Sequence, residues 1–226
     1  MKNKIIVRIG EVFILAGILI IFFPTIMNTV SNFEMADVIN NFDKESSQTS
    51  EDESDLIYKK IQDYNNELYE SGQKIVDAFS YEDVPINLLE YGYEQNVIGY
   101  ISIEKIKVKL PIYLGATKDN MKKGAINLGQ TSLPIGGINT NAVIAAHSGM
   151  IKNKMFSDLN KLNIGDEIEI TNLWETMNYK VCEKMIINPS DLSKIMIQEN
   201  RDLVTLITCY PYRVNSHRLI VVCERN

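Results

Sequence analysis

The sequence predicts a mainly β domain that follows an apolar helix and an amphipathic helix. From Asn96 onward, short runs of β-branched and aromatic residues alternate with Gly, Pro and Asn, which is typical of strands joined by short connections. Ahead of them, apolar side chains in residues 56–72 recur at helical spacing. An almost unbroken apolar run, from Val12 to Phe23, lies near the amino terminus. We therefore expect a closed or nearly closed β-barrel over 96–226, with short helices between strands.

The amino-terminal run is expected to anchor the chain in a membrane. Counted from Ile5, the stretch "IIVRIGEVFILAGILIIFFP" has about the 20 residues that a bilayer-spanning helix requires. The basic residues before it predict that the amino end stays in the cytoplasm and that the domain lies outside. No small-x-small cleavage pattern follows Pro24, which favours an uncleaved signal anchor over a cleaved signal peptide. Residues 1–40 are thus expected to be a membrane anchor and its flank.

Two further regions separate this anchor from the predicted barrel. Residues 41–55, "NFDKESSQTSEDESD", are acidic and rich in serine, so we expect a solvated linker. In residues 56–95 an amphipathic helix comes first, with Gly72 near its end. The apolar positions on this helix are Ile57, Ile61, Tyr64 and Leu68.

Within the barrel region the pattern predicts seven strands and two short helices. The short helices are expected at 154–162 and at 190–198, the second with Ser190 as its cap. The strands are expected at 97–103, 108–114, 142–147, 166–171, 176–187, 203–209 and 217–224.

Composition excludes several classes of function. The net charge of −6 argues against non-specific nucleic-acid binding. Three cysteines and two histidines occur without a CxxC pair or a Cys/His cluster, so we expect no zinc site, no disulfide framework and no cofactor. Cys182 and Cys223 lie in apolar strands and are interpreted as packing residues. Trp174 is interpreted as a loop anchor and His217 as a surface or core-edge residue.

The residues that could carry chemistry are Cys209, His147 and Arg218. Cys209 ends one predicted strand, and Arg218 lies near the start of the next. Because side chains alternate along a strand, Arg218 and His217 face opposite sides, which leaves His147 as the imidazole available to a cleft shared by Cys209 and Arg218. Cations near a thiol favour the thiolate nucleophile, and the same cations stabilise an oxyanion. The alternative is that a single cysteine at a strand end is a packing residue.

Ordered motifs across the barrel region resemble the sortase family. They are "NVIGYISIEKIKVKLPIYLGA", "LPIGGINTNAVIAAHSG", "MFSDLNKLNIGDEI", and "TLITC" with an arginine nine residues after the cysteine. The resemblance implies an eight-stranded β-barrel and a membrane-anchored cysteine transpeptidase. It also implies Cys209 as nucleophile, His147 as acid/base, Arg218 as oxyanion or substrate clamp, and Thr208 as a substrate contact.

The resemblance further implies the substrates. A sortase cleaves an LPxTG-like sorting signal of a surface or pilin protein after its threonine, through a thioacyl enzyme. An amine then resolves the intermediate, either a pilin lysine or the peptidoglycan precursor lipid II. The segment "LPIGG" (133–137) resembles such a signal but is interpreted as a turn.

The segment ahead of the barrel, "IQDYNNELYESGQKIVDAFSYED", is similar to the helix and lid of class C, the pilin-polymerising sortases. Their lid commonly reads Asp-Pro-aromatic, and Asp77, Ala78 and Phe79 match it with alanine in place of proline. Phe79 as a simple core anchor is the alternative. Class C members usually carry a carboxy-terminal membrane span, which does not follow here, so a wall-anchoring sortase stays open. A non-enzymatic surface module is a further alternative.

Overall fold

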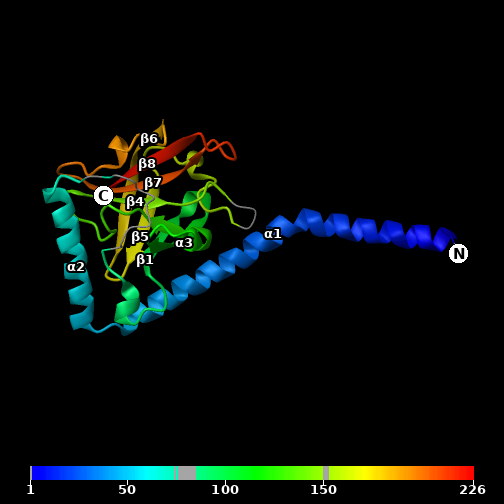
Figure 1. Ribbon diagram of the computed structural model, residues 1–226, viewed down its shortest axis with the longest axis horizontal. Coiled ribbons are helices and arrows are strands. Elements are labelled where there is room, and N and C mark those ends of the chain that lie inside the picture. Colours follow the sequence, from blue (N-terminus) through cyan, green and yellow to red (C-terminus); the bar gives the residue numbers. More distant parts are fainter. Residues whose placement is uncertain (1, 74, 76–84, 150–152) are drawn as a thin grey trace.

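The computed structural model describes residues 2–73, 75, 85–149 and 153–226, with the side chains of residues 2–7 and 9 left aside. A closed β-barrel forms the body of the molecule, and a long helix projects from it (Figure 1). Strand order around the described barrel is β1-β2-β3-β4-β7-β8-β6-β5, in which the β2–β3 and β4–β7 pairs are parallel and the others antiparallel. The strands are β1 (Val97–Ile103), β2 (Val108–Leu114), β3 (Ala125–Asn127), β4 (Thr140–Ala145), β5 (Glu167–Asn172), β6 (Thr176–Ile187), β7 (Asp202–Tyr210) and β8 (His217–Arg225).

The barrel confirms the predicted fold class. All seven predicted strands are present, with bounds that differ by two residues or fewer. Their apolar side chains fill one continuous core, in which Ile101, Ile112, Leu206 and Ile220 are buried almost completely. The eighth strand, β3, was not predicted, because its three residues are too few to establish an alternating pattern.

Both predicted inter-strand helices are wrong as helices. Each region contains a single 3₁₀ turn, η3 (Leu159–Lys161) and η4 (Ser193–Ile195), and Ser190 caps neither of them. In the first region, Phe156, Leu159 and Leu162 recur at a spacing that fits a helix, yet all three reach the core from an irregular segment. The remaining short elements are α3 (Lys118–Lys123), η1 (Leu88–Tyr91) and η2 (Glu104–Ile106).

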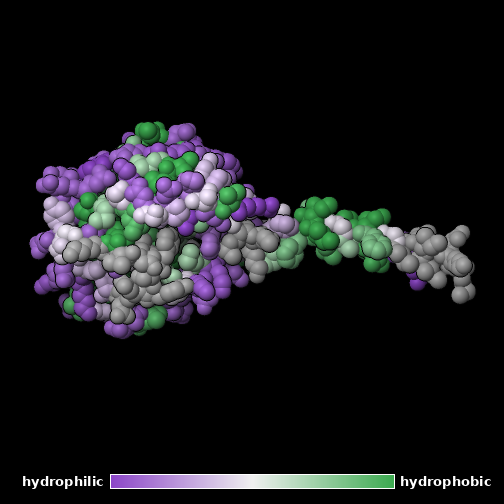
Figure 2. All heavy atoms as spheres, turned by 45° about the horizontal axis from the view of Figure 1, so that its top comes forward, coloured by the Kyte–Doolittle hydropathy of each residue, from purple (hydrophilic) through white to green (hydrophobic). Residues whose placement is uncertain are grey.

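The amino-terminal helix α1 (Lys2–Gln48) is much longer than the predicted span. It contains the one stretch, among the described residues, that is long and apolar enough to cross a membrane, with a mean hydropathy of 2.2 and no burial against the protein. Figure 2 shows these apolar side chains exposed along the projecting part of the helix. The other end of α1 packs on the barrel through Met35, Ile39 and Phe42.

The solvated linker expected at 41–55 is helical, apart from a break at residues 49–50. Burial of Phe42, whose ring centroid lies 6.5 Å from that of Tyr93, extends α1 to Gln48. The serine and acidic residues form a helix start, because the Ser50 side chain accepts a hydrogen bond from the Glu53 amide and acidic residues fill the first turn of α2. Composition indicated exposure, and Phe42 is the one buried residue of the segment. The division of the chain at residues 40, 55 and 95 stays a prediction.

Helix α2 (Glu51–Glu70) stands beside the barrel (Figure 1) and confirms the predicted amphipathic pattern. Ile57 and Ile61 are fully buried. Asn65, on the same face, binds both the amide and the carbonyl of Leu133. Trp174 anchors the loop after β5, because its indole N–H donates to the Ser54 hydroxyl at 2.8 Å. The helix is therefore fixed to the barrel along its length.

Candidate active site

Cys209 and Arg218 lie directly opposite each other on neighbouring strands. Cys209 is the second-last residue of β7, and Arg218 is the second residue of β8, its paired residue in the antiparallel ladder. Opposite side chains in such a ladder share a face, with Cβ atoms about 5 Å apart. Both side chains are partly buried, and the thiol is free. The next pair, Tyr210 with His217, faces the other side, and His217 is exposed there as expected.

His147 reaches the same end of the sheet from β4. Strand β4 runs parallel to β7, and Ala145 pairs with Ile207. His147 lies two residues after Ala145, and Cys209 lies two residues after Ile207. The two site residues are therefore at the same level of adjacent parallel strands. One further backbone bond, from the Ala146 amide to the Ile207 carbonyl at 3.2 Å, continues the ladder toward them.

Thr208 connects the two strands just before the site. Its buried hydroxyl donates to the Ala146 carbonyl at 2.8 Å, next to His147 in the chain. This hydrogen bond holds the segment that carries the imidazole against the strand that carries the thiol. Substrate contact by Thr208 stays a prediction.

A close approach of two loops encloses the site. Gly149, two residues after His147, has a φ of +116°, and an added Cβ would lie 3.1 Å from Ser157 and 3.2 Å from the ring of Tyr212. Glycine is required here both for the backbone conformation and for the contact. Tyr212 belongs to the β7–β8 loop, so this contact joins the loop after β4 to the loop after Cys209.

A small cavity of about 140 Å³ opens beside Cys209. Phe156, Tyr212 and Leu219 give it apolar walls, and Thr208 also contributes. A cavity of this size holds one mid-sized apolar group. His147 and Arg218 do not line it, so it is a recess next to the thiol rather than the space between the three groups. Phe156 and Tyr212 were not predicted as site residues, although the aromatic-rich loop "YPYRVNS" was a signal for the second.

The electrostatics of the site differ between its two basic side chains. Burial lowers the pKa of His147 below its usual 6.5, and no charged neighbour among the described residues contributes, so the neutral imidazole predominates at neutral pH. Arg218 presents its donors from a planar guanidinium of fixed geometry. One of its terminal nitrogens, Nη1, donates to the carbonyls of Asn215 and His217, whereas its Nε is buried without a hydrogen-bond partner among the described residues. The guanidinium thus keeps a donor without a partner in the described part of the structure.

The other cysteines are structural. Cys223 is fully buried, and burial raises the pKa of its thiol. Cys182 donates to the Val222 carbonyl and accepts from Arg201, and its pKa is also raised by burial. The described residues include no group of three or more His, Cys, Asp or Glu side chains that could hold a metal ion. The predicted lid residues Asp77 and Phe79 lie outside the described residues.

Comparison with known proteins identifies the family. The model of the sortase domain matches residues 101–226, which contain all three candidate residues and more than half of the chain. The chain belongs to the sortase family. Sortase A of Bacillus anthracis is 30% identical over 128 residues, which are 57% of this chain and 59% of that protein. Sortase A of Listeria monocytogenes is 23% identical over 96% of this chain and 89% of that protein. This chain thus spans about six tenths of the length of the first of these relatives.

Solved sortase structures match more of the chain and bear out the resemblance to class C. Sortase C1 of GBS pilus island 1 superimposes with a TM-score of 0.75 at 30% identity, over 85% of this chain and 92% of that chain. Sortase C-1 of Streptococcus pneumoniae superimposes with a TM-score of 0.73 at 37% identity, over 83% of this chain and 97% of that chain. Sortase C of Clostridium perfringens, solved with a C-terminal cell wall sorting motif, superimposes with a TM-score of 0.72 at 35% identity. The match covers 84% of this chain and 98% of that chain. These matches cover more of the chain than the barrel region, so they also include residues ahead of it.

Proposed function

We propose that this sortase is a membrane-anchored cysteine transpeptidase that cleaves an LPxTG-like sorting signal and joins it to an amine. The observation that carries the proposal is the pairing of Cys209 with Arg218, with His147 at the same level of the adjacent strand. A nucleophile, a proton carrier and a fixed cation are the groups that acyl transfer through sulfur requires.

The first half-reaction forms a thioester. The Cys209 thiolate attacks the threonine carbonyl of the signal, and the carbonyl electron pair moves onto oxygen. The free Nε of Arg218 donates to this oxyanion. When the C–N bond breaks, protonated His147 gives its proton to the leaving amine. Because burial favours the neutral imidazole, the imidazolium is the minor form of His147 in the resting enzyme.

The second half-reaction reverses these roles. An incoming amine loses a proton to neutral His147 and attacks the thioester carbon, and Cys209 leaves as the thiolate. The recess beside Cys209 has room for one apolar side chain of the sorting signal, and its Phe156 and Tyr212 walls suit such a group. Thr208 lines the same recess and is proposed to contact the signal there.

The favoured acceptor is a pilin lysine. Support comes from the solved relatives, which include sortase C1 of GBS pilus island 1 and a pilus-related sortase C of Group B Streptococcus. Anchoring of proteins to lipid II is the second candidate, supported by the sortase A relatives. A competition between a lysine-bearing pilin domain and a lipid II analogue, with the covalent products weighed by mass spectrometry, separates them. We expect the pilin product to predominate, and a predominance of the lipid II product would reassign the enzyme to wall anchoring.

The lid is proposed for Asp77 and Phe79. The chain enters this segment from a fixed point, because Gln73 donates to the Gln130 carbonyl at 2.8 Å and accepts from the Ile197 amide at 2.7 Å. A plugging aromatic shields the thiol, so Phe79→Ala is expected to raise the rate at which a thiol reagent labels Cys209. An unchanged labelling rate would contradict the lid and favour the core-anchor interpretation.

The decisive variants are Cys209→Ala and His147→Ala. Each is expected to abolish cleavage of an LPxTG-type peptide by the full chain in detergent, while its circular dichroism spectrum stays that of the wild type. Cys182→Ala is the matched control, because this second half-buried thiol lies outside the site, and it is expected to retain cleavage. Cleavage by a folded Cys209→Ala variant would remove the mechanism, and absence of any cleavage by the wild type would favour a non-enzymatic surface module.

A further inference from the structure

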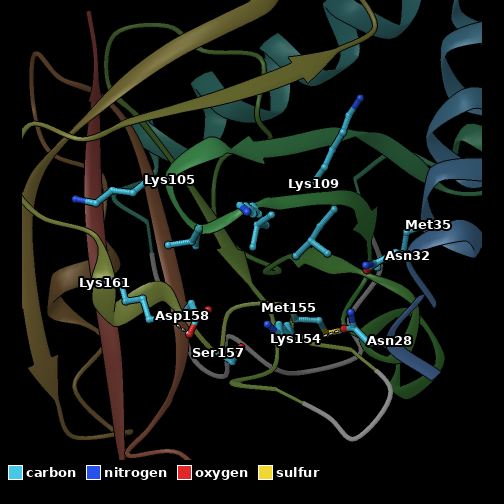
Figure 3. A pocket seen from close by; sticks show the side chains of 14 residues that line it. Asn28, Asn32, Met35, Lys105, Lys109, Lys154, Met155, Ser157, Asp158 and Lys161 are labelled. Carbon is cyan, nitrogen blue, oxygen red and sulfur yellow. Dashed lines mark hydrogen bonds and ion pairs between the residues drawn. The ribbon is translucent and has the colours of Figure 1, made fainter. Parts of the chain in front are cut away.

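A second and larger cavity lies between α1 and the barrel, on the side from which α1 projects. Its volume is about 380 Å³. Asn28 and Asn32 of α1 form one wall, the turn between β1 and β2 forms another, and residues 154–161 close it (Figure 3). This cavity is distinct from the recess at Cys209, although Ser157 lines both. The segment 154–161 thus separates the two.

The charge of this cavity is opposite to that of the chain. The whole protein carries a net charge of −6, yet Asp158 is the one acidic residue among those that line the cavity. Five exposed lysines oppose it, namely Lys105, Lys107, Lys109, Lys154 and Lys161, and we call this cavity the lysine pocket. Such a concentration of one sign in an acidic protein indicates an anionic ligand.

Two of the lysines are free to bind that ligand. Lys105 is paired with Asp166 at 2.7 Å, and Lys161 with Asp158 at 3.0 Å. Lys109 lies over the ring of Tyr100, 4.4 Å from its centroid, and points away from the other labelled lysines in Figure 3. Lys107 and Lys154 form no ion pair with any residue that the structure describes. They line the same cavity from two different segments, the turn between β1 and β2 and residues 154–161.

The position of the pocket along α1 indicates where the anion comes from. The 20 residues from Ile5 to Pro24 have a helical length of about 30 Å, which matches the apolar thickness of a bilayer. Asn28 and Asn32 follow this stretch on the side of the barrel. The barrel is attached at the same level, since the Lys154 amide donates to Asn28 at 3.2 Å and the Asn153 side chain donates to Ser31 at 3.2 Å. With α1 across the membrane, the lysine pocket lies among the lipid headgroups.

We propose that the lysine pocket binds the phosphate headgroup of an anionic phospholipid. The inference rests on the membrane anchoring included in the proposed function. Lys107 and Lys154 contact the phosphate, and Asn28 and Asn32 supply amide groups from the helix side. A headgroup held there fixes the barrel against the membrane, with residues 154–161 between the lipid and the Cys209 recess. The height of the recess above the bilayer then does not depend on bending of α1.

The test is a titration of the full chain in neutral detergent with short-chain phosphatidylglycerol, with bound lipid counted by native mass spectrometry. Saturable binding is expected, with none for short-chain phosphatidylcholine. Lys107→Gln/Lys154→Gln is expected to weaken it about 25-fold, since each lysine near an anionic surface contributes about a factor of five. Lys118→Gln/Lys123→Gln removes the same charge from the exposed helix α3 and is expected to bind like the wild type.

Three results would overturn the proposal. If Lys107→Gln/Lys154→Gln binds phosphatidylglycerol as tightly as the wild type, the lysine pocket is not the binding site. If Lys118→Gln/Lys123→Gln weakens lipid binding equally, the effect comes from the net charge of the protein and not from the pocket. Inorganic phosphate that binds as tightly as the lipid would leave an anion site unrelated to the membrane.

Separate readouts keep this test independent of the enzyme activity. Flotation of the full chain with phosphatidylcholine vesicles tests the anchor alone, and a chain that stays unbound would overturn both the anchor and the membrane role of the pocket. The pocket variant is expected to cleave a soluble sorting peptide in detergent at the wild-type rate, since neither lysine lines the Cys209 recess. Failure of peptide cleavage in the wild type would count against the transpeptidase and leave the lipid result standing.

Discussion

Replacement of Arg218 by lysine separates the charge of this residue from its geometry. The guanidinium is held by two backbone carbonyls through Nη1, and its buried Nε has no hydrogen-bond partner among the described residues. Lysine keeps the charge but loses this fixed second donor. Removal of one oxyanion donor typically lowers the rate about 100- to 1,000-fold, which corresponds to about 3 to 4 kcal/mol of transition-state stabilisation. We therefore expect Arg218→Lys to lower kcat for thioester formation by about 100-fold or more.

The assay is single-turnover release of the leaving peptide from an LPxTG-type substrate, followed by mass spectrometry. Arg225→Lys is the matched control, because Arg225 lies at the opposite end of the same strand and pairs with Glu175 and Asp202. It is expected to keep the wild-type rate. A folded Arg218→Lys variant that retains most of the wild-type rate would refute the role of Nε and reduce Arg218 to a general positive charge.

Three further predictions concern the surroundings of the thiol. Gly149→Ala, which forces a Cβ against Tyr212 at a φ of +116°, is expected to slow thioester formation and to lower Tm, and an unchanged Tm would contradict the close contact. Thr208→Val leaves the Ala146 carbonyl unpaired and is expected to cost about 1 to 3 kcal/mol in urea unfolding; a neutral result would mean that water replaces the hydroxyl. Because burial lowers the pKa of His147, the unfolded chain takes up this proton first as pH falls below about 6.5. Below about pH 6.5, the free energy of unfolding of the wild type should therefore fall relative to that of His147→Gln, whereas above it the two should change with pH in parallel. Parallel curves over the whole pH range would contradict the effect of burial on His147.

The sequence predicted the barrel well because most of its strands are long enough to show their pattern. Residues 176–187 alternate polar and apolar side chains, and residues 217–224 carry a β-branched apolar run, and both patterns are typical of strands. Strand β3, with three residues, has no such pattern and is recruited by pairing with β2 and β4. Burial from irregular backbone misled the prediction at residues 154–162, where apolar spacing fits a helix but the chain forms only a turn.

The acidic segment shows the limit of composition as a guide. Its exposure was predicted from residue types, but its helices depend on local order: Ser50 followed three residues later by Glu53, and Phe42 placed to reach Tyr93. The candidate site was more accessible to prediction, because Cys209 and Arg218 belong to consecutive strands joined by a short loop. Phe156 and Tyr212, which line the recess beside Cys209, lie in two loops that are far apart in the sequence. Their proximity depends on the closure of the barrel, so the sequence alone did not predict it.

The most direct test of the transpeptidase mechanism is the intact mass of the full chain after incubation with an LPxTG-type peptide and no added amine. We predict a mass increase equal to the peptide fragment that ends at threonine, located on Cys209 by peptide mapping and released when an amine is added. An increase that persists in Cys209→Ala, or peptide cleavage by the wild type with no such intermediate on Cys209, would contradict the proposed mechanism.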